Sequence, residues 1–335
     1  LARLIAEAVD GDDKTKERAE RILDLCGFKA KLEKKEEDDD AVSERSKMLI
    51  YTTRQAIEEM AGFLKTAKQE PDADLAKKFA EIISTKVHVP DMALSGRMLE
   101  PAKPKKKKDG TKQIDVWKGY ETTVEAALQV AHAISTHEAR PEVDYYVAAD
   151  DIPGDDAGAG YVDEAMFASA CFYKFFSIDW RQLVKNLNGN EPLAAHTVGA
   201  FIRAAVCANP SGKQNSFAAH NPPDGLLVEF KKSPVSYANA FANPASRGSR
   251  DLVAQSIAQL AQYVRDIDAG FGAPDARYWF SPNRRFALEV NEDNASVAVP
   301  ANNIGSLDQL IRDVVAQLGH DWDAVQQAVA VPRSE

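Results

Sequence analysis

Apolar positions recur at helical spacing in the first part of the chain. One helix face is marked at i, i+3, i+4 and i+7 by Ala19, Ile22, Leu23 and Cys26, and Gly27 stands where that helix would stop. The pattern continues to about Ser95, interrupted by the acidic run EKKEEDDD and resumed by SKMLIYTTRQAIEEMAGFLKTA. Adjacent like charges repel and bury no apolar surface, so we expect the acidic run to be a solvated linker.

The pattern changes to short strands after Val124. AALQVAHAIST and FASACFYKFFSIDW are rich in β-forming residues, and the second is apolar on both faces, as in a central strand covered on both sides. GLLVEFKK alternates like a half-buried strand, and a helix from about Pro192 to Ala208 precedes it. This order of strand, strand, helix and strand predicts an α+β fold with a ferredoxin-like sheet, whose first strand and helix would precede Leu1.

Two further helices are predicted as cover for this sheet. Ser249 can cap the first, whose apolar face is Val253, Ile257, Leu260, Val264 and Ile267. Ser306 can cap the second, which ends at Gly319 and has as its apolar face Leu307, Leu310, Ile311, Val314 and Leu318.

Alternation and turn residues predict a β-hairpin at VDYYVAADDIPGDD. One face would carry Val143, Tyr145 and Val147, and the other Asp144, Tyr146 and Ala148. The aspartates of this stretch lack the spacing of a calcium loop, so a solvated hairpin is favoured over a metal site. Two interpretations of Tyr145 and Tyr146 stay open: ordinary hairpin packing, or stacking on the bases of single-stranded nucleic acid.

Composition places the chain among ordinary globular proteins. The 335 residues are 44% apolar and 27% charged, and no apolar run is long enough for a membrane span, so we expect a cytoplasmic protein. Cys26, Cys171 and Cys207 are widely spaced among apolar neighbours, which predicts three buried thiols. His132 and His137 would face opposite sides of a strand, so a shared metal is not expected.

Lysines are concentrated in one proline-containing loop between Glu100 and Gly119, although the formal net charge is -10. PSGKQN, at residues 210–215, is the nearest match to a phosphate-binding loop, but it lacks that motif's first glycine and its Ser or Thr, which excludes an NTPase. No catalytic triad can be proposed from spacing, because such groups assemble in space rather than along the sequence.

Five motifs occur in order along the chain: ALSGRM (93–98), QVAHAISTH (129–137), VDYYVAADD (143–151), GKQNSFAAHNP (212–222) and YANAFA (237–242). With these motifs the sequence resembles the CasC family, the CRISPR RNA-binding backbone subunit of the type I-E surveillance complex Cascade. The resemblance runs from about Ala93 to the C-terminus.

The resemblance implies a protein without catalysis, cofactor or metal. It would bind CRISPR guide RNA, polymerise with further copies of itself, and join other Cascade subunits in recognising target DNA. It implies helical fingers at 1–127, a ferredoxin-like (RRM-like) palm at 128–138 and again, with C-terminal helices, at 170–335, and a thumb hairpin at 139–169. The thumb would kink the guide and turn one base out.

The resemblance also assigns residues. Met98 would wedge against a base, and the thumb contacts would be Tyr146 and Val147. Arg97 and Lys213 would contact phosphates, with Gln214 and Asn215 nearby. The family's N-terminal strand and its basic segment are not matched in this sequence.

Two questions remain open beside the resemblance. In an RNA-cleaving relative, such as a type III backbone subunit, a thumb aspartate like Asp150 or Asp151 would act at the kinked phosphate. The lysines Lys105, Lys106, Lys107 and Lys108 form either a solvated insertion or a sequence-independent contact with guide or target DNA.

Overall fold

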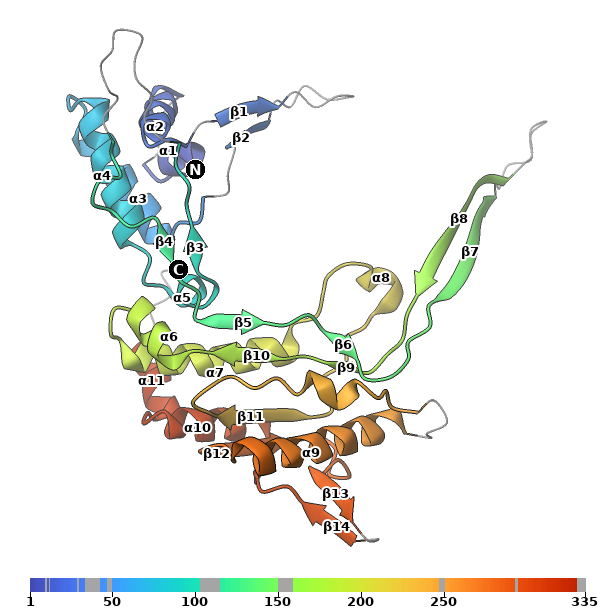
Figure 1. Cartoon of the computed structure of the whole chain (residues 1–335). Coiled ribbons are helices and arrows are strands. Elements are labelled where there is room, and N and C mark those ends of the chain that lie inside the picture. The colour runs from blue at the N-terminus through green and yellow to red at the C-terminus, as the bar shows by residue number, and fades with distance from the viewer. Residues whose placement is uncertain are drawn as a thin grey trace. The chain divides into compact units, whose positions relative to one another are not determined.

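The computed structural model shows a mixed α+β protein (Figure 1). It describes residues 1–9, 11, 13–28, 30–33, 43–46, 50–102, 115–149, 159–246, 251–292 and 295–329. The chain divides into two compact units, the first formed by Leu1–Gln129 with Ile178–Ala194 and the second by Val130–Ser177 with Ala195–Glu335. Among the described helices, none has the length and apolar character that crossing a membrane requires.

The first unit is mainly helical, and its large apolar core is formed mostly by the first four of its helices. The helices of this unit are α1 (Ala2–Glu7), α2 (Asp13–Leu25), α3 (Arg54–Thr66), α4 (Asp72–Thr85), α5 (Pro90–Ser95) and α6 (Trp180–Asn186). The core contains Ile22, Met60 and Phe79, all fully buried. Gly27 follows α2 with φ +86°, which confirms the predicted helix stop, because L-residues avoid this left-handed conformation.

Two short strands that were not predicted lie on either side of the acidic run. β1 (Ala30–Glu33) and β2 (Ser43–Ser46) flank it and pair in antiparallel register, while most of the run lies outside the described residues. The next helix begins only at Arg54, because the Thr53 side chain accepts a hydrogen bond from the Ala56 amide and caps α3 there. The expectation that helix resumes directly at Ser46 is therefore wrong.

The second unit contains a three-stranded sheet that is covered on both faces. β11 (Leu226–Phe230) pairs antiparallel with β12 (Ala276–Phe280), and β12 pairs parallel with β15 (Asn302–Ile304). Because side chains alternate along β12, Tyr278 packs with Leu310 of α10 (Leu307–Gln317) while Trp279 packs with Val264 of α9 (Leu252–Phe271). The remaining elements are η1 (Ala238–Phe241), β13 (Glu289–Glu292), β14 (Ala295–Ala298) and α11 (Trp322–Val329).

The predicted helices of this unit are confirmed with one change of cap. α7 (Glu191–Cys207) and α10 lie where expected, and Ser306 caps α10 by accepting from the Gln309 amide. In α9 the cap is Asp251, which accepts from the Ala254 amide, and Ser249 lies outside the described residues. An aspartate directly before the first helical residue satisfies the same free N–H groups as a serine would.

A buried ionic network joins β11, β12 and α9. Arg277 donates from Nε to Glu229 Oε1 (2.5 Å) and from Nη2 to Asp268 Oδ1 (2.7 Å). The Tyr237 hydroxyl donates to Glu229 Oε2 and accepts from Lys231 Nζ, both at 2.6 Å. Burial lowers the pKa of Arg277, but its hydrogen bonds to Asp268 and Glu229 outweigh burial and raise it. Every charge here therefore has a direct partner.

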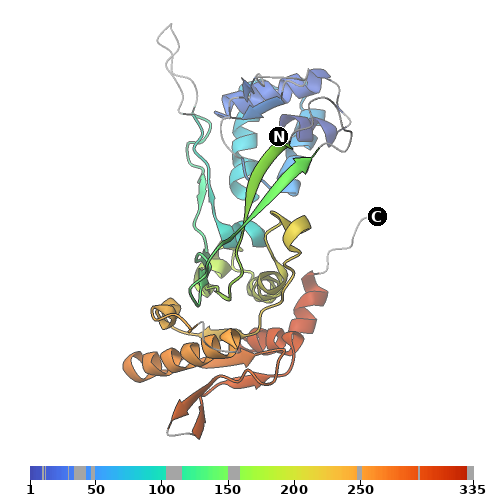
Figure 2. The same cartoon turned by 90° about the vertical axis from the view of Figure 1, so that its right-hand side faces the viewer.

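The predicted hairpin is confirmed as β7 (Glu142–Ala149) and β8 (Ala159–Phe167), and Figure 2 shows it as a twisted green ribbon. FASACFYKFFSIDW is not one covered strand. It forms the end of β8 and two short strands, β9 (Phe172–Tyr173), which pairs with β6 (Ile134–Ser135), and β10 (Phe176–Ile178), which pairs with β5 (Leu128–Val130). The apolar residues on both faces of this segment therefore did not mean that other elements pack on both faces.

Candidate nucleic-acid interface

The hairpin presents aromatic side chains to solvent. Tyr145 is 69% exposed and Tyr146 is 48% exposed, although the Tyr146 hydroxyl donates to Asp163 Oδ2 across the ribbon at 3.1 Å. Tyr145 pairs with Glu164, and Val147 pairs with Val162. The backbone of Val147 is described but its side chain is not. The hairpin therefore offers large exposed rings for contact, rather than a packed core.

The same hairpin is strongly acidic. From Pro141 to Tyr173 the sequence has no Lys or Arg, and its acidic residues are Glu142, Asp144, Asp150, Asp151, Asp155, Asp156, Asp163 and Glu164. Such a segment repels phosphates, because like charges at contact distance are unfavourable even in water. If it meets nucleic acid, it must do so through the bases and not through the backbone.

The loop after α7 contains the predicted residues Lys213, Gln214 and Asn215. Lys213 has φ 56° and caps the short helix α8 (Gln214–Phe217), which Ala218 ends at φ 46°. Gln214 Nε2 donates to the Pro210 carbonyl at 2.7 Å, so this side chain holds the loop together. Lys213 and Asn215 are exposed and remain accessible to a partner.

A ring contact joins this loop to the hairpin. Phe217 of α8 packs on Phe167 at the end of β8, with ring centroids 5.0 Å apart. The contact places the predicted thumb residues and the predicted phosphate-binding loop in one structural unit. Because Lys213 and Ala218 both hold left-handed backbone conformations, which cost non-glycine residues roughly 1–2 kcal/mol, the loop has a conformation that its surroundings must maintain.

Arg97 and Met98 lie in the first unit, in β3 (Arg97–Met98), which pairs with β4 (Thr123–Val124). Met98 is 69% exposed, as a base-wedging side chain needs to be. Arg97 is only 4% exposed, and its Nη1 donates to the Ile83 carbonyl at 2.7 Å. Among the described residues, Nε and Nη2 have no acceptor. Burial lowers the pKa of Arg97 to about 10, and a phosphate contact by this residue would need the side chain to move outward.

Several predicted residues lie outside the described part of the chain. These are Lys105, Lys106, Lys107 and Lys108 of the lysine loop, and Asp150 and Asp151 of the hairpin tip.

The cysteine and histidine predictions have mixed outcomes. Cys26 is buried, but Cys171 is only half-buried and Cys207 is exposed at the end of α7, so the prediction of three buried thiols is wrong. His137 is buried and accepts a hydrogen bond from the Cys171 amide through Nε2 (3.1 Å), while Nδ1 lies 3.0 Å from the Glu138 carbonyl. Both ring nitrogens of His137 thus bind the backbone, which gives this histidine a structural role.

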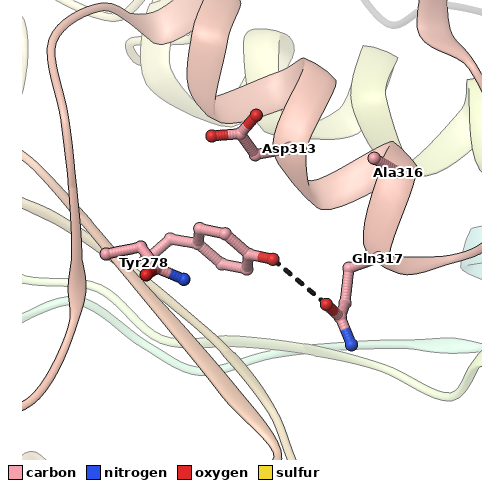
Figure 3. Close-up of a pocket in the computed structure, with 5 residues that line it drawn as sticks. Tyr278, Asp313, Ala316 and Gln317 are labelled. Atoms are coloured by element: carbon pink, nitrogen blue, oxygen red, sulfur yellow. Dashed lines mark hydrogen bonds between the residues drawn. The ribbon is translucent and has the colours of Figure 1, made fainter.

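A shallow cavity of about 450 Å³ lies between the sheet and α10, and its lining is Tyr278, Asn302, Asp313, Ala316 and Gln317. Figure 3 shows the Tyr278 hydroxyl pointing at Gln317, and it donates to Oε1 at 3.3 Å. Burial raises the pKa of Tyr278, and the Asp313 carboxylate raises it further. The described lining residues include no basic side chain, so this cavity is not suited to phosphate groups.

Comparisons with known proteins show the family of this chain and solved structures that resemble it. The family model for CT1975-like protein matches residues 1–312, and the chain belongs to that family. A solved structure titled "CRISPR RNA-guided surveillance complex, pre-nicking" contains a similar chain, with TM-score 0.69 and 25% identity over 94% of this chain and 83% of that one. Another, titled "CRISPR RNA-guided surveillance complex", gives TM-score 0.52 and 31% identity over 59% and 73%. No curated protein matches by sequence.

Proposed function

We propose that this protein is a CRISPR RNA-binding backbone subunit of a surveillance complex, and specifically of a type I-E Cascade. The observation that supports the proposal most is the similarity over 94% of the chain to a chain of an RNA-guided surveillance complex. Several copies would line the guide RNA beside other Cascade subunits in the cytoplasm and present the guide to target DNA. Base pairing then reads sequence while the protein holds the backbone.

The side chains divide this task according to charge. Met98 and the hairpin rings Tyr145 and Tyr146 are exposed and bear no charge, so they suit contact with bases. Lys213 is exposed in a loop of fixed conformation and suits a phosphate. The carboxylates of the hairpin keep the RNA backbone away from it, which favours insertion of the hairpin at a point where bases are unstacked.

The first experiment is purification of the complex followed by analysis of the bound nucleic acid. A backbone subunit should copurify with RNA of uniform length, and that length should fix the number of copies. Heterogeneous RNA in proportion to the cellular pool, or no RNA at all, would contradict the proposed role.

We further propose that the protein has no catalytic activity of its own. The alternative is RNA cleavage by a hairpin aspartate, which can be tested by incubating the complex with complementary RNA and a divalent cation. The RNA should stay intact with the wild type and with Asp150→Ala and Asp151→Ala alike. Regularly spaced cleavage by the wild type that either variant abolishes would establish the cleaving alternative.

A further inference from the structure

The strand pair beside the hairpin has one packed face and one open face. Tyr173 of β9 points inward: its hydroxyl accepts from the Tyr237 amide at 2.9 Å, and its ring lies 5.4 Å from that of Phe241. Phe172 precedes it in the same strand and therefore points to the opposite side, where it is 59% exposed. A phenylalanine with this exposure leaves most of its apolar area in water, which favours contact with a partner.

A positive charge follows this ring closely along the chain. Lys174 is exposed two residues after the start of β9, and the sequence from Pro141 to Tyr173 contains no Lys or Arg. The strand that pairs with β9 is β6, with Phe172 opposite Ser135 and Tyr173 opposite Ile134. An exposed aromatic ring is thus followed closely by the first cation after an acidic stretch.

We propose that Phe172 stacks on a base of single-stranded RNA while Lys174 contacts the adjoining phosphate. The inference rests on the proposed function and adds a contact that the five motifs do not assign. An aromatic ring on an open sheet face is a general means of binding unpaired bases, because every base has a face that can stack. The other occupant of such a face would be a second copy of this chain. The cores of protein interfaces are depleted in lysine, and Lys174 therefore favours RNA.

The test uses the full chain and a labelled single-stranded RNA too short to hold two copies. Phe172→Ala should weaken binding roughly 5- to 150-fold, the range expected for one stacked base. Phe172→Trp should bind like the wild type because it keeps a stacking face, whereas Phe172→Leu should lose affinity because it keeps apolar area alone. Lys174→Ser should weaken binding and reduce the salt slope by about 0.7, as for one single-strand phosphate. The matched control is Phe271→Ala, which removes a phenylalanine 85% exposed at the end of α9 and should change nothing.

The outcomes separate this inference from the proposed function. If the wild type binds and Phe172→Ala binds equally well, the stacking contact is refuted and the RNA-binding function stands. The inference is also refuted if Phe172→Leu binds like the wild type, or if the variants lose only the association of several copies on a long RNA, since either result assigns the face to a protein contact. A wild-type chain that binds no RNA of any length overturns both.

Discussion

Replacing Arg277 by methionine should lower the free energy of unfolding by about 3–5 kcal/mol, the usual result when one partner of a buried ion pair is removed. The Arg277 side chain is 3% exposed, and its partners Glu229 and Asp268 are 10% and 16% exposed. The variant would leave both carboxylates with little water and without their shared cation. Lys231, 3.3 Å from Glu229, would offset part of the charge on that side alone. For a protein unit of this size the loss corresponds to a fall in Tm of about 6–20 °C.

The assay is thermal and urea unfolding, with Arg203→Met as the matched control. Arg203 is also in an ion pair, with Asp308 at 2.6 Å, but both side chains are exposed, so its removal should cost little. Adding Glu229→Gln and Asp268→Asn to Arg277→Met should restore part of the stability, because no charge is then buried without a partner. If Arg277→Met is no less stable than Arg203→Met, the reasoning about desolvation of this network is wrong.

Three further predictions concern binding and thiol chemistry. Met98→Ala with Tyr146→Ala should weaken assembly on guide RNA by roughly 1–3 kcal/mol for each base that is no longer stacked, measured by titration, and unchanged assembly would refute both assignments. Changing all of Lys105–Lys108 to Ser should preserve RNA assembly but weaken target-DNA binding, with a salt slope smaller by about 0.9 for each phosphate that is no longer neutralised; superimposable curves would leave the lysines as a solvated loop. Cys207 should react with a thiol reagent at pH 8 in the native protein, whereas Cys26, whose pKa burial raises to about 12, should react only on unfolding.

Sequence periodicity predicts the elements whose signals are local. The α10 helix can be placed because Ser306, an apolar face and Gly319 all agree within one short stretch, and the hairpin can be placed from alternation and turn residues. Such patterns do not predict the β12 strand, because ARYWF has Arg277 among aromatic residues and is neither alternating nor uniformly apolar. Arg277 can be buried only because Glu229 of β11 and Asp268 of α9 bind it. No local sequence pattern indicates this pairing.

At the candidate site, too, the sequence does not show which of the assigned residues are exposed. Met98 and Tyr146 are assigned by resemblance, and they are exposed as those roles require, but Arg97 next to Met98 is buried. Adjacent strand residues point to opposite sides, so one of this pair faces the core while the other faces solvent. The exposure of Phe172 could not be predicted from the sequence. The composition of its segment suggests that both faces of the strand are covered, and only the fold shows which face has a neighbour.

The hairpin β7–β8 is a ribbon of two strands, so each strand has one edge without a neighbouring strand among the residues that the structure describes. Unpaired edge strands can recruit the same edge of another molecule and so begin aggregation, and charged side chains are a common protection. Here the carboxylates from Glu142 to Glu164 make each ribbon repel every other ribbon. The acidity of the hairpin thus also keeps free chains apart in solution. Added salt, which screens these charges, should therefore promote edge-to-edge association of free chains.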